Sequence, residues 1–400
     1  MRRRTALALP PAALLASCSD RGADASDASG STSRPSSSDG GSEASGKKTT
    51  PSPSPTPDAA EQRAADLSDE EAAAQLVLVG IPAGTTPASS LISDLRVGGF
   101  FLLGIWDSAD TVRALVEDIG DRVGDGDVSP LLSVDQEGGQ VRMLRGSAAR
   151  RTPSAATLGE QGTDAVTDAY TSIGEDLAGL GLHAALAPVA DAVDPELGSA
   201  NAPVGKVDRG FGTDPAHVAD CVVAATKALD GQQVASALKH FPGLGRVRGN
   251  TDFSAEDITD EKTDADSSYL DPFRAGIDAG ADMVMLSSAL YPRLDEDTPA
   301  MFSRPIVTEL LRGSMGFDGL VVSDDVGSAA AVQDVPVAER ATRLLEAGGD
   351  VVLTADPDLA EQLVEAIADW ASQSKATARR VRESAARMLR VKQARSVPGA

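Results

Sequence analysis

Two consecutive carboxylates, Asp324 and Asp325, end an apolar run with the sequence GLVVSDDVG. A carboxylate pair at the end of a strand suits nucleophilic or acid/base work on a glycosidic bond. The alternative interpretation is a helix N-cap, because Asp is one of the residues favoured at that position, and Asp325 fits this role. The pair is therefore a candidate for chemistry, for capping, or for one role at each residue.

A second acidic segment follows another apolar run. Asp135 and Glu137 lie in DQEGG, directly after PLLSV. The two glycines allow the backbone to approach a ligand closely. A bare turn with acidic residues would look similar, so this segment alone does not separate a binding site from a turn.

A third group of polar residues combines two hydrogen-bond donors with a glycine-rich loop. Lys239 and His240 end the run VASALKHF and lead into PGLGRVRGNTD. Two donors at one strand end suit the hydroxyl groups or a carboxylate of a ligand, whereas a lone histidine is more often structural. The loop is expected to be mobile and able to close over a substrate. It lacks the spacing of a phosphate-binding loop.

The segments that must position these residues alternate between strand and helix. Short, nearly continuous apolar runs are typical of strands that are buried on both faces of a parallel sheet. Helical patterns lie between them, and several end at glycine. The predicted strands are QLVLVG, GGFFLLG, PLLSVD, LHAALAPVAD, VASALKHF, DMVMLSS, GLVVSDD and DVVLTAD, and the predicted helices include TVRALVEDIGDRV, HVADCVVAATKALDGQ, PIVTELLRGSMG and AERATRLLEAGG.

Eight such strands in regular alternation over residues 61–395 predict a single (β/α)8 barrel, the TIM-type α/β fold. The rival is a doubly wound open sheet, which is disfavoured because no G-x-G-x-x-G follows the first strand. Barrel enzymes keep their chemistry at the C-terminal ends of the strands. The polar residues that fall there are Asp135, Asp191, Lys239, His240, Asp324 and Asp325.

Six motifs, in order, resemble those of family 3 glycoside hydrolases, in particular the single-barrel bacterial β-N-acetylhexosaminidases. The resemblance covers about residues 70–390 and implies a barrel without the second, sandwich domain that many relatives carry. The motifs are VGGFFLL, SVDQEGG, LAPVAD, DRGFGTDP, KHFPGLG and FSRPIVTELLRGSMGFDGLVVSDD.

The resemblance also implies roles for individual residues. Asp324 is expected to be the nucleophile that forms a glycosyl-enzyme intermediate, so that hydrolysis takes two steps and retains the anomeric configuration. Arg142 is included among the sugar-binding residues, although the family has an arginine where this chain has Gln140. The residues expected to bind sugar hydroxyls are Asp135, Arg142, Arg209, Lys239 and His240.

The chain departs from the family pattern in the loop after KHFPG. The family's proton donor there is a histidine in a D-x-H dyad, whereas this chain has Asp252 followed by Phe and Ser254. None of the three histidines in the chain lies in that loop. Carboxylates serve as the acid/base in most glycosidases. Asp252, or alternatively Glu256 or Asp257, is therefore expected to take this role.

The first eighteen residues, 1–18, predict an export signal. A basic start and a short apolar run precede Leu-Ala-Ser-Cys, and the run is too short for a membrane-spanning helix. This ending resembles the bacterial lipobox, in which the cysteine, here Cys18, is lipidated; the alternative is an ordinary signal peptide that contains a cysteine. Residues 19–60, rich in Ser, Pro and Gly, predict a disordered tether. The protein is thus expected outside the cell, held on the outer face of the cell membrane by lipid alone.

The composition limits the partners. Lys and Arg number 36 against 60 Asp and Glu, a net charge of −24, which argues against nucleic acid or an anionic lipid surface as partner. The second cysteine, Cys221, lies in an apolar helical pattern, which favours a buried residue over a nucleophile. The sequence has neither zinc-ligand spacing nor a disulfide framework, and no metal or cofactor is expected.

Three functions from different classes remain. The leading hypothesis is a lipoprotein glycosidase that acts on terminal β-N-acetylglucosaminyl or related residues of cell-wall glycans, with an atypical acid/base. The second is a glycan-binding lipoprotein that kept the pocket and lost efficient turnover. The third, a purely structural envelope protein, leaves the polar residues at the strand ends unexplained.

Overall fold

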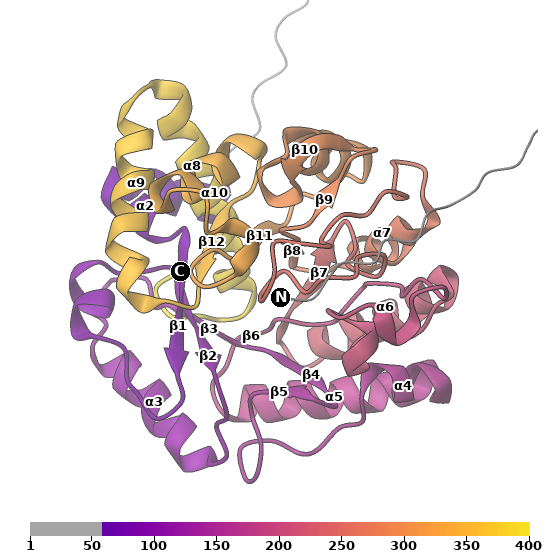
Figure 1. Cartoon of the computed structure of the whole chain (residues 1–400). Coiled ribbons are helices and arrows are strands. Elements are labelled where there is room, and N and C mark those ends of the chain that lie inside the picture. The colour runs from indigo at the N-terminus through magenta and orange to yellow at the C-terminus, as the bar shows by residue number, and fades with distance from the viewer. Residues whose placement is uncertain (1–57) are drawn as a thin grey trace, which may run out of the picture. The chain divides into compact units, whose positions relative to one another are not determined.

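Eight parallel strands close into a barrel (Figure 1). The computed structural model describes residues 58–400, so the predicted signal and most of the predicted tether lie outside the described residues. The order around the barrel is β1-β12-β11-β8-β7-β6-β3-β2, which confirms the (β/α)8 prediction and excludes the open sheet. Each predicted strand overlaps one of these: β1 (Val77–Pro82), β2 (Gly99–Leu103), β3 (Leu131–Val134), β6 (Ala184–Ala185), β7 (Ala235–Phe241), β8 (Met283–Leu286), β11 (Leu320–Asp325) and β12 (Val351–Thr354).

Helices connect the strands, and the four helical segments predicted from sequence correspond to α3, α6, η6 and α8. Helix α6 begins at Pro215 behind an Asp214 cap, and α8 ends at Gly348, whose φ of 110° suits glycine. The helices are α1 (Ala59–Asp66), α2 (Asp69–Ala74), α3 (Ala109–Asp121), α4 (Ala155–Gln161), α5 (Thr163–Gly179), α6 (Pro215–Asp230), α7 (Asp271–Asp278), α8 (Val337–Ala347), α9 (Ala360–Ser372) and α10 (Lys375–Ala394), with π-helical η1 (Ser90–Asp94) and η6 (Pro305–Ser314).

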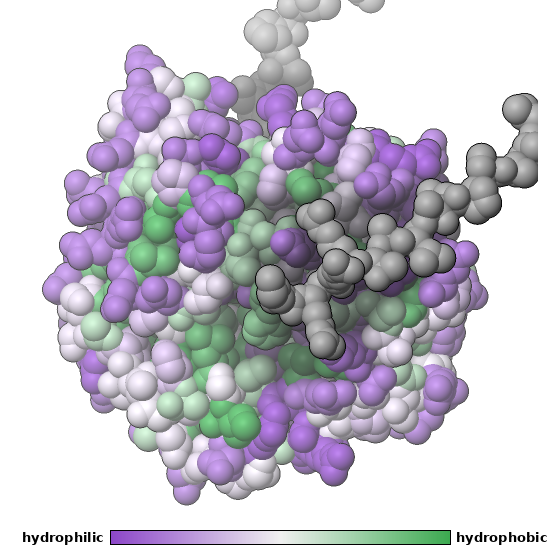
Figure 2. All heavy atoms as spheres, in the orientation of Figure 1, coloured by the Kyte–Doolittle hydropathy of each residue, from purple (hydrophilic) through white to green (hydrophobic). Residues whose placement is uncertain are grey.

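Shorter elements lie in the loops. Two small antiparallel sheets pair β4 (Gln136–Gly138) with β5 (Val141–Arg142) and β9 (Leu290–Tyr291) with β10 (Asp295–Pro299). Short 3₁₀ turns are η2 (Gly198–Ala200), η3 (Gly205–Val207), η4 (Ser268–Leu270), η5 (Ala300–Phe302), η7 (Ala330–Val332) and η8 (Pro357–Leu359). On the visible face, polar and charged residues form most of the outer surface and apolar residues gather toward the middle (Figure 2).

The folded domain begins slightly before the predicted boundary at residue 61. The side chain of Asp58 accepts a hydrogen bond from the Glu61 N–H, and Glu61 accepts one from the Asp58 N–H, so together they cap α1. Both carboxylates also pair with Arg390 of α10, at 2.5 and 2.6 Å. Residues 58–60 therefore belong to the domain and not to the tether.

Helix α10 closes the N-terminal end of the barrel. Met388 and Val391, with Val397 beyond the helix, pack against apolar residues at the starts of the strands. Arg395 pairs with Asp282, the residue before β8, at 2.6 Å. This end is thus filled with side chains, which leaves the C-terminal end of the barrel for a site.

Removing a buried side chain of α10 from the N-terminal end of the barrel should destabilise the domain. Met388 is fully buried, so Met388→Ala leaves a cavity and is expected to lower the free energy of unfolding by about 2–5 kcal/mol. Arg379→Ala on the same helix is the control, because the Arg379 side chain is 76% exposed, and it should change stability by less than about 0.5 kcal/mol. Urea unfolding measures both. An equal decrease in the free energy of unfolding in the two variants would contradict the packing of Met388 described above.

Candidate active site

A cavity of about 400 Å³ lies at the C-terminal ends of the strands. Strands β3, β7 and β11 each deliver polar side chains to it from their ends, and the loops after β6 and β7 add others. The structure therefore brings together residues that are far apart in the sequence. The predicted site residues that line the cavity are Asp135, Arg209, Lys239, His240, Asp252 and Asp324.

Arg142 is the predicted sugar-binding residue that lies outside the cavity. Its Nε donates to the Gly139 carbonyl at 2.8 Å, within the β4–β5 hairpin. Val141 and Met143 line the cavity on either side of it, and side chains alternate between the two faces of a strand. Arg142 therefore points away, while Gln140, the position of the family's arginine, does line the cavity.

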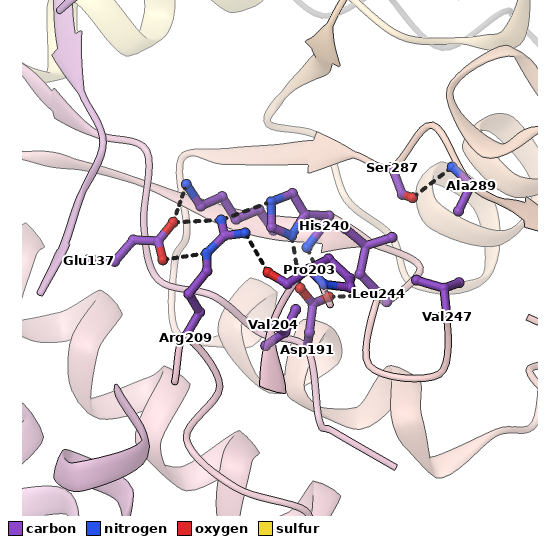
Figure 3. A network of polar contacts seen from close by, with 12 residues as sticks. Glu137, Asp191, Pro203, Val204, Arg209, His240, Leu244, Val247, Ser287 and Ala289 are labelled. Atoms are coloured by element: carbon purple, nitrogen blue, oxygen red, sulfur yellow. Dashed lines mark hydrogen bonds and ion pairs between the residues drawn. The ribbon is translucent and has the colours of Figure 1, made fainter. Parts of the chain in front are cut away.

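A buried ion-pair network fixes two cations beside the cavity (Figure 3). The Lys239 Nζ atom lies 2.5 Å from Asp135 Oδ1 and 2.7 Å from Glu137 Oε1. Arg209 forms a two-pronged contact with Glu137, at 2.8 Å for each bond. Burial alone would raise the pKa of Glu137, but the charges of Arg209 and Lys239 outweigh it and lower that pKa to about 2. Glu137 therefore stays ionised near neutral pH.

His240 is held in one tautomer. Its Nδ1 atom lies 2.8 Å from Asp191 Oδ2, and its Nε2 atom lies 3.3 Å from Arg209 Nη2. Because a guanidinium only donates hydrogen bonds, the contact with Arg209 uses Nε2 as the acceptor and leaves Nδ1 to donate to Asp191. Asp191 and Arg209 thus fix the orientation of the His240 ring.

The loop after β7 is fastened near its start and at its tip. Near its start, the Asn201 Nδ2 atom donates to the carbonyls of Leu244 and Val247, each at 2.7 Å. At its tip, the Asp252 and Thr251 carbonyls accept hydrogen bonds, each at 3.2 Å, from the backbone N–H groups of residues 330 and 331 in η7. The loop that was expected to be mobile is thus bound to its neighbours in this structure.

The loop that carries η7 is itself organised by Arg340, a buried residue of α8. Its guanidinium donates to the carbonyls of Val326 and Val335, the second at 2.7 Å. This loop begins directly after β11, the strand that ends in Asp324 and Asp325. Arg340 therefore ties the loop that holds Asp252 to the strand that carries the predicted nucleophile.

Asp324 and Asp325 have different roles. Burial raises the pKa of Asp324 to about 6, and the nearby charge of Asp252 adds to the effect. The carboxylate of Asp325 instead accepts backbone hydrogen bonds from Gly327, Ser328 and Ala355 at 2.8–3.0 Å. Asp325 thus caps the turn after β11, although no helix begins there, so the helix N-cap interpretation was wrong; both Asp324 and Asp325 line the cavity.

Among the three carboxylates that were candidates for the acid/base, Asp252 is the one that lines the cavity. Glu256 and Asp257 are exposed and lie outside its lining. The Ser254 hydroxyl is turned back on its own loop, where it donates to the Glu256 carbonyl at 3.0 Å. The position of the family's histidine therefore contributes no proton donor to the cavity.

A sequence profile of the glycosyl hydrolase family 3 N-terminal domain matches residues 69–391. This chain belongs to glycosyl hydrolase family 3. A β-hexosaminidase of Xanthomonas oryzae is 37% identical over 246 residues, which cover 59% of this chain and 70% of that protein. The solved β-N-acetylhexosaminidase of Beutenbergia cavernae is 42% identical with a TM-score of 0.79, over 82% of this chain and 99% of that one. A family 3 β-N-acetylglucosaminidase from a Paenibacillus species is 27% identical with a TM-score of 0.72, over 83% and 63%.

Three residues that position the site of this family 3 glycoside hydrolase were not predicted to belong to it. Glu137 forms ion pairs with both Arg209 and Lys239. Asp191 orients the ring of His240. Asn201 donates hydrogen bonds that hold the loop after β7. Asp191 had been noted at a strand end and Glu137 in an acidic turn, which were usable signals. Asn201 lies in a loop with no pattern that marks it.

Two further observations concern the other residue types. Cys221 is buried, and burial raises the pKa of its thiol to about 11, which agrees with a packing role and not with a nucleophile. Within residues 58–400, no group of three or more His, Cys, Asp and Glu side chains is arranged to hold a metal ion.

The raised pKa of Asp324 predicts a stability effect that depends on pH. The folded state binds this proton more tightly than the unfolded chain, so the ionised carboxylate costs stability above about pH 6, and the cost fades as the pH falls from about 6 toward 4. Asp324→Asn should therefore unfold at higher urea concentration than wild type at pH 8, with a smaller difference at pH 5.

Asp325→Asn is the matched control, because the substitution weakens backbone hydrogen bonds and should destabilise the domain at both pH values. If Asp324→Asn were no more stable than wild type at pH 8, the ionised Asp324 carboxylate would not lower the stability of the folded domain.

Proposed function

We propose that this glycoside hydrolase removes terminal β-N-acetylglucosaminyl, or closely related, residues from cell-wall glycans and retains the anomeric configuration. The observation that carries the proposal is that Asp324 and Asp252 line one cavity, near enough for the charge of Asp252 to raise the pKa of Asp324. Retaining glycosidases use two such carboxyl groups. The names of the relatives in Xanthomonas oryzae and Beutenbergia cavernae support the choice of sugar.

The two carboxyl groups hold one proton between them, and the reactive form is the one with Asp324 ionised and the proton on Asp252. In the first step, Asp324 attacks the anomeric carbon and forms a glycosyl ester. The bond to the leaving oxygen breaks, and that oxygen takes a proton from Asp252. In the second step, Asp252 removes a proton from water, the water attacks the anomeric carbon, and Asp324 is released. The pair thus ends the cycle with the single proton with which it began.

The buried cations supply donors for the sugar hydroxyls. The Lys239 ammonium has three N–H groups, and Asp135 and Glu137 accept two of them, which leaves one for a ligand. The second oxygen of Asp135 can accept from a hydroxyl. Their ion pairs hold these groups in place before the sugar arrives, so little ordering is required when it binds.

The runner-up function is a glycan-binding protein that has lost efficient turnover. The observation that favours it is Ser254, which stands in place of the family's histidine and bonds within its own loop. Turnover of an aryl β-N-acetylglucosaminide, measured beside a calorimetric titration with the corresponding sugar, separates the two. Binding with turnover supports the enzyme, and binding without turnover supports the runner-up.

The proposed proton donor makes a prediction about leaving groups. Asp252→Asn removes the donor, so kcat/KM for an unactivated disaccharide should fall by about 10²–10⁴-fold. An aryl glycoside with a good leaving group needs little protonation and should lose much less. Glu256→Gln, in the same loop but outside the cavity, is the control and should resemble wild type. Equal losses for both substrates in Asp252→Asn would exclude the role of Asp252 as donor.

We also propose that the chain is an exported lipoprotein, anchored on the outer face of the cell membrane through Cys18. The support is the basic start, the short apolar run and the Leu-Ala-Ser-Cys ending, all of which lie outside the described residues. In residues 58–400, no helix combines the length and the apolar character that crossing a bilayer requires.

Changing Cys18→Ser should move the protein from the membrane pellet to the soluble fraction or the medium, because the residue that carries the lipid is lost. One acyl chain binds only marginally, so stable anchoring requires more than one chain on the cysteine. Fractionation followed by immunoblotting measures the distribution, with Ser19→Ala as the control. A Cys18→Ser protein that pellets as fully as wild type would refute the anchor.

A further inference from the structure

Phe253 is held at the mouth of the cavity with its ring exposed. Among residues 58–400, the large hydrophobic side chains that are exposed are Phe253, at 84%, and Ile105, at 54%. A single exposed apolar residue usually needs no explanation. Phe253 differs from Ile105 because it lines the cavity and directly follows Asp252.

The backbone on either side of Phe253 is fixed. The Asp252 carbonyl accepts a hydrogen bond from the Ala330 N–H at 3.2 Å, and the N–H groups of Phe253 and Ser254 donate to the Asn250 carbonyl at 3.1 and 2.9 Å. The Ser254 hydroxyl adds its bond to the Glu256 carbonyl at 3.0 Å. These contacts fix the backbone that carries the Phe253 ring at the rim of the cavity.

The position of Asp252, the proposed proton donor, determines which part of the substrate lies beside the Phe253 ring. A general acid must lie within hydrogen-bond reach of the oxygen that it protonates. The departing sugar is bonded to that same oxygen, so it emerges from the cavity beside Asp252. The next residue along the loop is Phe253, with its ring open to solvent.

We propose that Phe253 forms a binding platform for the leaving-group sugar, against which a β-linked pyranose lays the apolar face of its ring. The inference rests on the proposed function in one respect, that Asp252 faces the glycosidic oxygen. A pyranose presents C–H groups on its face and hydroxyls around its edge, so it can cover the phenyl ring while its hydroxyls stay in water.

Such a platform determines the class of substrate. The phenyl ring contacts the face of the pyranose and forms no hydrogen bond with it, so the platform accepts pyranoses that differ in their substituents. It favours glycans of two or more β-linked sugars over glycosides whose leaving group has no ring. An aromatic contact of this kind is expected to change affinity by about two- to tenfold.

Equilibrium binding tests the platform separately from turnover. In an Asp324→Asn background, which cannot form the glycosyl ester, calorimetry measures the Kd of the β-1,4-linked N-acetylglucosamine disaccharide and of N-acetylglucosamine. Adding Phe253→Ala should raise the disaccharide Kd about two- to tenfold and leave that of the monosaccharide unchanged. Phe253→Trp should keep the disaccharide affinity, and Ile105→Ala, at the exposed residue outside the cavity, should change neither value.

Two results would overturn the platform: an unchanged disaccharide Kd in Phe253→Ala, or an equal loss of affinity for both sugars, which would indicate a general disturbance of the loop. The proposed function can fail independently. If wild-type protein turns over no glycoside while the disaccharide-specific loss is observed, the platform stands and hydrolysis by this site does not.

Discussion

The carboxylate of Asp324 occupies a desolvated position in which the charge of Asp252 opposes its own. Lys239 and Arg209 line the same cavity, but they pair with Asp135 and Glu137 and form no ion pair with Asp324. Asp324 is therefore not stabilised in an ion pair, as its proposed role as nucleophile requires. The cations and carboxylates of the neighbouring network pair with one another, and Asp325 accepts backbone hydrogen bonds from Gly327 and Ala355.

The proximity of the Asp324 and Asp252 carboxylates explains why the loop after β7 is held by several hydrogen bonds. Like charges repel, so two carboxylates remain near each other only if their backbones are held. Asn201 holds the stem of the loop, and η7 holds its tip through the carbonyl of Asp252. Because η7 belongs to the loop organised by Arg340, directly after β11, the spacing of the two carboxylates depends on one continuous set of hydrogen bonds.

The strands could be predicted from the sequence because strands buried on both faces leave long apolar runs, and the barrel topology then places their ends together. That reasoning located Asp135, Lys239, His240 and Asp324 in one site. It could not locate Asn201, whose partners lie 43 and 46 residues away in a loop without periodicity. The family resemblance, in turn, placed Arg142 in the site, since sequence alone does not say which face of the short hairpin strand turns inward. The choice among Asp252, Glu256 and Asp257 likewise required the conformation of the loop.

The identity of the nucleophile is tested most directly by trapping the covalent intermediate. An activated fluorosugar with the N-acetylglucosamine configuration slows the second step, so the glycosyl ester accumulates and can be assigned by mass spectrometry of proteolytic peptides. We expect one modified residue, Asp324, and no adduct in Asp324→Asn. An adduct on Asp325 or Asp252 in wild-type protein would contradict the division of roles between these carboxylates.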